Sequence, residues 1–249
     1  ALILAPAGLS PIVIARGKAA DERVRDVKRF WKEGGSPDPE SNVQFGEGGA
    51  GTFSDGKLTT GIRDPRIRKV LEELVAAGAD PKILYVHKPH IGTDRLVEIV
   101  KGIRRQIEGL GGEVRFGTRL DGIRTEGGRL TAVETTGGEI ETDRLVLAIG
   151  HSAADTFRML FEEGLEMEQK PFSIGVRIEH PQEDINAAQY GDKALADILG
   201  PAEYKLSHRC EGTGRGVYTF CMCPGGVVVN ASTEPETSVT NGMSYSRRN

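Results

Sequence analysis

The segment spanning residues 113–150 constrains the fold more strongly than any other part of the chain. Glycine pairs at 127–128 and 137–138 separate short alternating stretches, and such pairs are typical of tight turns between antiparallel strands. The apolar run Arg144–Gly150 follows, and such runs are typical of strands buried on both faces of a parallel sheet. We therefore predict a three-stranded β-meander at about 118–142 and then a parallel-sheet strand. The predicted strands are 113–116, 119–124, 130–135, 139–142 and 144–150.

Helical periodicity surrounds this segment. Apolar side chains recur at helical spacing in several stretches, and a short apolar strand is predicted at 11–14. Strands that alternate with helices are typical of the α/β class with a parallel sheet. Beyond Lys170 the pattern changes to short strands and turns, which predicts a domain boundary between residues 1–169 and 170–249. The predicted helices are 21–31, 64–78, 93–111 and 152–163, and 1–8 reads as the end of another.

Composition and charge exclude several classes of partner. The 32 basic and 36 acidic residues give a net charge of −4 and form no run of like charge, which argues against nucleic acid as a partner. No apolar stretch approaches the roughly 18 residues that span a bilayer, and residues 1–9 lack the basic start of a secretory signal. Three cysteines are an odd count, which disfavours a disulfide framework. We expect a cytoplasmic protein that acts on a small-molecule substrate, with its oligomeric state open.

A glycine-rich stretch at 46–57 matches two phosphate-binding patterns only in part. Gly46–Gly51 has the spacing G-x-G-x-x-G, but no helical period follows it to receive a pyrophosphate. Gly51–Lys57 resembles a P-loop, but Leu58 stands where a hydroxyl must bind magnesium. A surface Ω-loop is the plain alternative. We favour a backbone laid against a flat or phosphorylated ligand, because glycine allows close approach.

Taken together, the strand, meander and Asp143–Ser152 turn resemble the FAD-binding domain of glutathione-reductase-like flavoproteins. More narrowly, four segments resemble a family of bacterial FAD-dependent dehydrogenases, also described as NAD(P)/FAD-dependent oxidoreductases. The resemblance implies a Rossmann-type parallel sheet with a β-meander, a partial α+β substrate domain, and FAD as cofactor. NAD(P)H is a candidate co-substrate. The four segments are 42–57, 88–94, 178–181 and 218–226.

The same resemblance implies a set of cofactor-binding residues and indicates no catalytic residue or metal ligand. The glycine-rich loop would lie along the flavin and its diphosphate, and the segment 118–120 would offer backbone groups to the adenine. For Gly150 a packing role is an equal alternative, and His151 is more often a surface residue than a catalytic base. The candidates are Arg16, Gly46, Glu47, Gly48, Gly49, Ala50, Gly51, Thr52, Ser54, Lys57, Thr118, Leu120, Ala148, Gly150 and His151.

Three departures from the family pattern bear on function. The first strand and its G-x-G-x-x-G turn are absent, and Ala15 and Arg16 stand where an acidic residue usually bonds the ribose. A second glycine-rich contact is also absent near the C-terminus. We therefore expect a fragment truncated at both ends. The alternatives are a nicotinamide-dependent reductase without flavin and a non-catalytic binding module of flavoprotein fold that does not retain FAD.

Three cysteines and one histidine near the C-terminus form a separate cluster of interest. His208 with Cys210, and Cys221 with Cys223, are each spaced two residues apart, so facing strands could assemble a zinc site. A redox-active thiol pair is a second possibility. Cysteines packed as small apolar groups are the leading interpretation. The resemblance adds that the turn at 221–226 lines the substrate side of the flavin.

Overall fold

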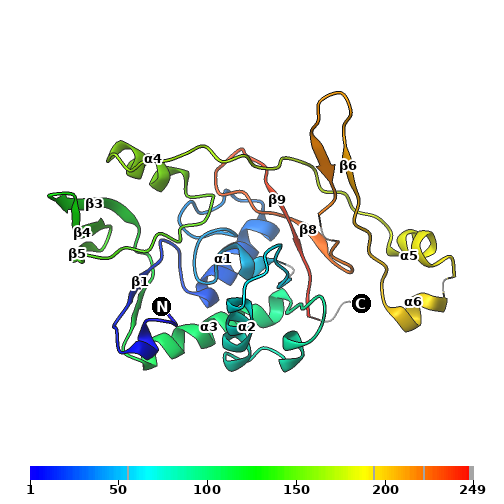
Figure 1. Cartoon of the computed structure of the whole chain (residues 1–249), viewed down its shortest axis with the longest axis horizontal. Helices are drawn as coiled ribbons and strands as arrows, with labels where there is room; N and C mark the ends of the chain where they lie inside the picture. Colours follow the sequence, from blue (N-terminus) through cyan, green and yellow to red (C-terminus); the bar gives the residue numbers. More distant parts are fainter. Residues whose placement is uncertain (55, 193, 221, 247–249) are drawn as a thin grey trace.

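The structure, a computed structural model, describes residues 1–54, 56–192, 194–220 and 222–246 (Figure 1). The α-helices are α1 Ala20–Glu33, α2 Arg66–Ala76, α3 Thr93–Gly109, α4 Ala154–Glu162, α5 Gln182–Tyr190 and α6 Ala194–Leu199. The short 3-10 helices are η1 Ala5–Ala7, η2 Gly49–Phe53 and η3 Pro81–Leu84. The strands are β1 Ile12–Ile14, β2 Glu113–Arg115, β3 Leu120–Glu126, β4 Arg129–Thr135, β5 Gly138–Glu141, β6 Ser207–Arg209, β7 Gly216–Tyr218, β8 Val227–Asn230 and β9 Thr240–Met243.

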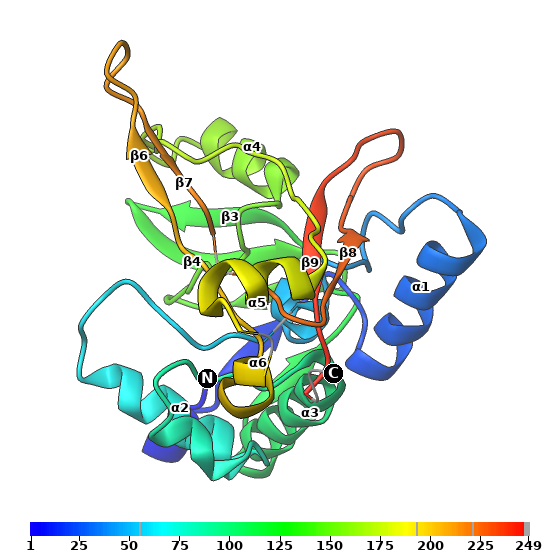
Figure 2. The same ribbon diagram turned by 90° about the vertical axis from the view of Figure 1, so that its right-hand side faces the viewer.

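A parallel pair of strands, β1 and β2, organises the N-terminal half, with Val13 opposite Val114. The chain leaves β1, forms α1, η2, α2 and α3, and returns as β2 (Figures 1 and 2). The helices α2 and α3 bury an apolar cluster around Ile83, Leu96 and Ile99. Their apolar stripes follow the spacing that the sequence predicts, so these helices are confirmed.

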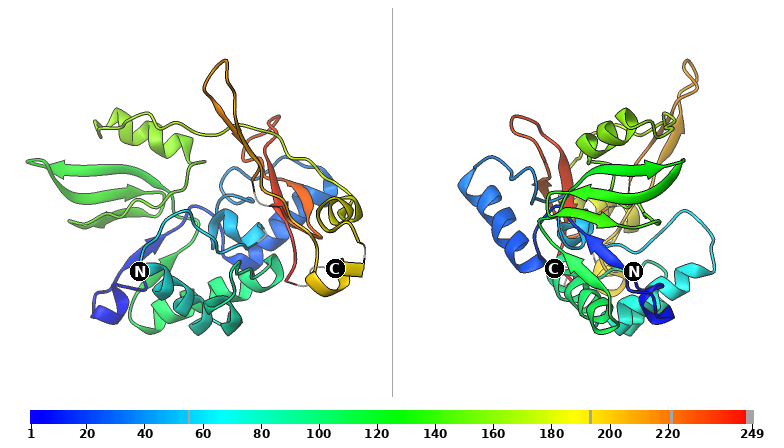
Figure 3. Two further views of the ribbon diagram at one scale, coloured as in Figure 1. Left: turned by 45° about the vertical axis from the view of Figure 1, so that its right-hand side comes forward. Right: turned by 90° about the vertical axis from the view of Figure 1, so that its left-hand side faces the viewer.

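The predicted β-meander is present as the antiparallel sheet β3–β4–β5. Left-handed glycines at Gly127, Gly128 and Gly138 make its turns, which is why glycine pairs mark them in the sequence. Figure 3 shows α4 lying along one side of this sheet, and the Ile123 amide donates to the carboxylate of Glu163 at 3.0 Å. The meander is therefore held to the helix that follows it.

The strand predicted at Arg144–Gly150 is wrong for this structure. The segment has no regular secondary structure, and Val146 is 81% exposed. An apolar strand needs neighbours that bond its backbone on both sides, and within the described residues the parallel sheet contains only β1 and β2. The chain is thus a mixed α/β structure with small sheets, and a wider Rossmann-type sheet stays a prediction.

Three smaller differences concern helix ends and the C-terminal region. Residues 1–8 form only the short η1, and α4 begins after Ala153 without a side-chain cap from Ser152. The helices α5 and α6 were not predicted, although the acidic first turn of α5 and left-handed Gly191 after it are ordinary helix signals. The boundary at residue 170 stays a prediction.

Two hairpins complete the C-terminal region. The hairpin β6–β7 projects away from the rest of the chain (Figures 1 and 2). The hairpin β8–β9 packs on α1, where the indole of Trp31 donates to the carbonyl oxygen of Asn230 at 2.8 Å. Ala231 also joins Val27, Val43 and Phe53 in one buried cluster. Across the described ranges, no helix combines the length and apolarity that crossing a bilayer requires.

The last described residues are fixed to the start of α3. The Ser246 amide and hydroxyl each donate to the Asp94 carboxylate at 2.6 Å, and the Thr93 amide donates to the Ser244 carbonyl oxygen at 3.1 Å. Gly92 has a φ of +88°, and a Cβ there would lie 2.2 Å from the Ser246 backbone nitrogen. Only glycine fits at this junction.

We predict that Gly92→Ala detaches residues 244–246, because the added methyl group meets backbone that cannot yield. Gly78→Ala is the matched control, since Gly78 has a φ of +109° with nothing within 4 Å of its Cβ position. Both variants place alanine at a positive φ, which costs roughly 1–3 kcal/mol. In urea unfolding, Gly92→Ala should lose more free energy of unfolding than Gly78→Ala, and only Gly92→Ala should expose residues 240–246 to hydrogen exchange. Equal losses of stability in the two variants would contradict the prediction.

Candidate functional site

The candidate site lies where β1 and β2 end. Backbone hydrogen bonds between the two chain segments continue beyond the strands. The amide of Thr118 donates to the carbonyl oxygen of Ala15, and the amide of Gly117 donates to that of Gly17. Ligands of open α/β sheets bind at the carboxyl ends of the strands. Arg16 and Thr118, which sequence reasoning selected separately, are therefore brought to one edge.

The glycine-rich loop, residues 46–57, packs directly against this edge. A Cβ on Gly17 would lie 2.6 Å from the Cα of Gly46, and a Cβ on Gly46 would lie 2.7 Å from the Arg23 side chain. Gly46 also has a φ of +114°, a conformation that side chains disfavour. Both glycines are thus required by contacts within the protein.

Glu47 fixes the loop to two helices. Its buried carboxylate accepts a hydrogen bond from the Ala20 amide, at the first turn of α1, at 2.7 Å. The other oxygen accepts from Arg104 of α3 at 2.8 Å. A carboxylate at a helix N-terminus is favoured by the exposed amides and the helix dipole. The N-terminus of α1 is therefore already paired with a negative charge from the protein.

Arg23 of α1 is the centre of a hydrogen-bond network with residues 42–47, which lead into the loop. Its fully buried guanidinium donates to the carbonyl oxygens of Asn42, Val43 and Glu47 at 2.7–2.8 Å, and it lies 4.8 Å from the Phe53 ring centre. Burial lowers the pKa of Arg23 to about 9, although the nearby charge of Glu47 opposes this effect. The guanidinium therefore stays charged at neutral pH and holds the loop in one conformation.

The outer part of the loop forms η2. A Cβ on Gly48 would lie 2.1 Å from the Thr52 hydroxyl, which itself donates to the Glu47 carbonyl oxygen at 3.0 Å. Gly49 has a φ of +58°. At Gly51, by contrast, φ is ordinary, the residue is exposed, and no atom lies within 4 Å of the Cβ position. Contacts within the protein thus explain Gly48 and leave Gly51 unexplained.

The end of the loop runs beside residues 89–93. The Ser54 hydroxyl donates to the Gly51 carbonyl oxygen at 2.8 Å, and the Ser54 carbonyl oxygen accepts from the Thr93 hydroxyl at 2.5 Å. Lys57 forms an isolated antiparallel bridge with His90. Asp55 lies outside the described residues. Ser54 therefore stabilises the turn itself and joins the loop to the start of α3.

Arg16 connects the end of β1 to the start of α4. Its guanidinium donates to the Asp155 carboxylate at 2.6 Å, lies 3.5 Å from the Glu40 carboxylate, and sits 4.7 Å from the Phe45 ring centre. Arg119 donates to the same Glu40 at 2.7 Å. Burial alone would raise the pKa of Asp155, but the bonds from Arg16 and the Thr156 amide hold it below its usual value.

The remaining candidates divide into two groups. Thr118 and Leu120 are buried, and the Thr118 hydroxyl donates to the Phe116 carbonyl oxygen at 3.1 Å. Ala148, Gly150 and His151 are exposed on the segment before α4. Gly150 has a φ of +71° and no atom within 4 Å of its Cβ position, so close packing does not account for it.

Sequence reasoning missed the residues that hold the site together. Arg23 carried a signal, because it shares the buried face of α1 with Ala20 and Val27, where a charged residue requires partners. Nothing in the sequence pointed to Glu40 or Asp155, since their contacts with Arg16 join residues far apart in the chain.

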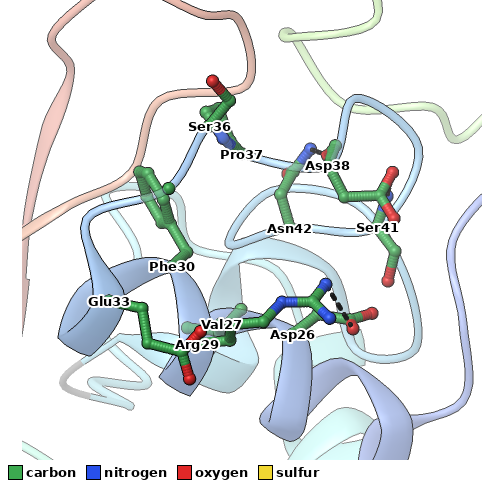
Figure 4. Close-up of a pocket in the computed structure, with 11 residues that line it drawn as sticks. Asp26, Val27, Arg29, Phe30, Glu33, Ser36, Pro37, Asp38, Ser41 and Asn42 are labelled. Carbon is green, nitrogen blue, oxygen red and sulfur yellow. Dashed lines mark hydrogen bonds and ion pairs between the residues drawn. The ribbon is translucent and has the colours of Figure 1, made fainter.

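A small cavity of about 100 Å³ lies beside α1, and Figure 4 shows the residues that line it. It is far smaller than the roughly 300 Å³ of typical small-molecule sites. Two of the lining residues, Arg29 and Asp26, form an ion pair. None of the candidate residues lines it. The lining residues are Asp26, Val27, Arg29, Phe30, Glu33, Gly35, Ser36, Pro37, Asp38, Ser41 and Asn42.

The cysteine cluster gains no support as a metal site. Within the described part of the chain, no group of three or more His, Cys, Asp or Glu residues could hold a metal ion. His208 and Cys210 belong to the hairpin β6–β7, whereas half-buried Cys223 precedes β8 and lies against Gly242 of β9. Cys221 lies outside the described residues, so the thiol-pair alternative is untested.

We predict that Arg23→Met lowers the free energy of unfolding by about 3–5 kcal/mol, because three buried carbonyl oxygens lose their donor. Arg25→Met is the control, since Arg25 lies on the exposed side of α1 and should change stability by less than about 0.5 kcal/mol. Urea unfolding measures both. Equal stability of the two variants would show that the loop does not depend on Arg23.

We also predict that the Asp155 carboxyl titrates with a pKa below its usual value and that Arg16→Met raises this pKa, because burial remains when the partner is removed. The lowered pKa stabilises the fold above the unfolded value, and this stabilisation is lost as the pH falls through the folded pKa. Carboxyl NMR titration measures the change. Asp64, whose pKa is lowered by the hydrogen bond from Arg66, should titrate identically in both proteins.

Comparison with known proteins adds three findings. Residues 171–249 match the family described as FAD-dependent protein, C-terminal domain-like. A protein of Clostridium beijerinckii (strain ATCC 51743 / NCIMB 8052), described as an uncharacterised protein, is 53% identical over 248 residues. The match covers 100% of this chain and 46% of that relative, so the chain spans about half of the relative's length.

Among solved structures, the L-amino acid deaminase of Proteus myxofaciens in complex with anthranilate is similar over 64% of this chain and 48% of that one. Its sequence identity is 13% and its TM-score is 0.33. The similarity of the C-terminal third of the chain to a domain of FAD-dependent proteins rests on the family match of residues 171–249.

Proposed function

We propose that this chain is part of an FAD-dependent oxidoreductase and that its glycine-rich loop lies against the FAD. The match of residues 171–249 to a family of FAD-dependent proteins supports the choice of cofactor. The position of the loop at the carboxyl ends of β1 and β2 supports the choice of site. When bound, FAD would supply hydride or electron transfer.

The main support for the proposal is Gly51, a glycine that contacts within the protein do not explain. Its ordinary φ and the open space around its Cβ position would allow any residue, so the fold does not require glycine here. Glycine in exposed backbone lets a ligand approach within van der Waals contact of the chain. The exposed positions Gly48 and Gly51 present such backbone on one stretch of the loop.

The buried residues of the site would act as positioning residues. Arg23 bonds the carbonyl oxygens of Val43, just before the loop, and of Glu47 within it, and the Glu47 carboxylate bonds α1 and α3. The exposed backbone of the loop would therefore be held in place before a ligand arrives. Rigid groups lose little entropy on binding. Arg16 and Asp155 fix the start of α4 beside the same edge, which sets where exposed Gly150 and His151 lie.

We predict that Gly51→Val lowers flavin retention without lowering stability, because its side chain would occupy the space where the ligand approaches. Gly35→Val is the matched control, since Gly35 also has an ordinary φ and nothing within 4 Å of its Cβ position. Gly48→Val is unsuitable, because its side chain would collide with Thr52 and disturb the fold. The measurements are the visible absorbance spectrum, the cofactor released on denaturation, and the Tm.

The expected result is bound FAD in the unchanged chain and in Gly35→Val, and loss of FAD in Gly51→Val at the same Tm. A folded, colourless chain that takes up no added FAD would support the alternative, a binding module of flavoprotein fold that does not retain its cofactor. Equal FAD retention in Gly51→Val and Gly35→Val would mean that the loop does not contact the flavin.

A further inference from the structure

The extended segment between α4 and α5 exposes apolar side chains in strict alternation. Phe172, Ile174, Val176 and Ile178 are 86, 91, 87 and 69% exposed. Alternate residues of an extended chain point to opposite sides, so these four share one face. An exposed apolar face of this kind in a soluble protein marks a surface that something else covers.

The opposite face of this segment is polar and makes contacts within the protein. The Ser173 hydroxyl bonds the hydroxyl of Tyr218 on β7. Arg177 donates to the carbonyl oxygen of Thr240 and to Asn241, both on β9, at 3.2 Å. Glu179 accepts from the Val228 amide of β8 at 3.0 Å. The polar side chains therefore contact the C-terminal hairpins, although they are exposed, whereas the apolar side chains lie on the other side of the segment.

The backbone of this segment is also available for pairing. In the ranges that the structure covers, no backbone–backbone hydrogen bond joins residues 172–178 to any other segment. An extended segment with an unpaired backbone is a template for another strand. Among the residues that the structure describes, no strand therefore pairs with this segment, and its apolar side chains stay exposed.

We propose that the face formed by Phe172, Ile174, Val176 and Ile178 is covered by a strand from the rest of a longer polypeptide. The family match begins at residue 171, so the segment belongs to the matched domain rather than to a connection before it. The relative from Clostridium beijerinckii matches the whole of this chain with only 46% of its own length. More than half of that protein is therefore available as the occupant.

The test uses the full-length relative from Clostridium beijerinckii with a photo-crosslinking amino acid at the position aligned with Ile174. We expect crosslinks to residues outside the region that matches this chain. The matched control carries the crosslinker at the position aligned with Ser173, which should crosslink within the matched region, near the position aligned with Tyr218.

Hydrogen exchange provides an independent readout in the same protein. We expect the amides aligned with 172–178 to exchange more than about tenfold more slowly in the full-length relative than in this 249-residue chain, because paired amides exchange only on opening. Crosslinks confined to the matched region, or rapid exchange in the full-length relative, would overturn the proposal. Crosslinks between two copies would assign the face to self-association and overturn it equally.

Discussion

The shape of the candidate site depends on the bonds that the Arg23 guanidinium makes to the carbonyl oxygens of the loop before η2. A charged group without access to water requires several well-placed acceptors, and the chain satisfies this requirement by folding residues 42–47 around it. Glu47 contributes both its carbonyl oxygen to Arg23 and its carboxylate to α1 and α3. The loop therefore has little regular secondary structure, but these hydrogen bonds fix its conformation.

Features that depend on local spacing could be predicted from the sequence, and features that depend on distant neighbours could not. The helix α3 and the meander follow from apolar periodicity and from glycines in left-handed turns. The segment 144–150 was predicted as a strand from its apolar composition alone. Composition does not show whether another strand lies beside it, and the structure provides none among the described residues.

The candidate site shows the same division. The glycine-rich stretch was expected to contact a ligand throughout, but Gly46 and Gly48 are required by contacts with Arg23, Val100 and Thr52 inside the protein. A sequence cannot distinguish a glycine that makes room for its own chain from one that makes room for a ligand. Likewise, the pairing of Arg16 with Asp155 joins two residues whose separation in the sequence gives no hint of contact.

The double role of Thr93 has a consequence for any shortened form of the chain. Its backbone amide binds Ser244, while its hydroxyl binds the carbonyl oxygen of Ser54 at the end of the glycine-rich loop. One residue thus tethers the last strand and the loop to the same turn of helix. Cleavage after Met243 would remove the acceptor of the Thr93 amide. The first turn of α3 would then be held less firmly, and the conformational entropy of the loop bonded to it would increase.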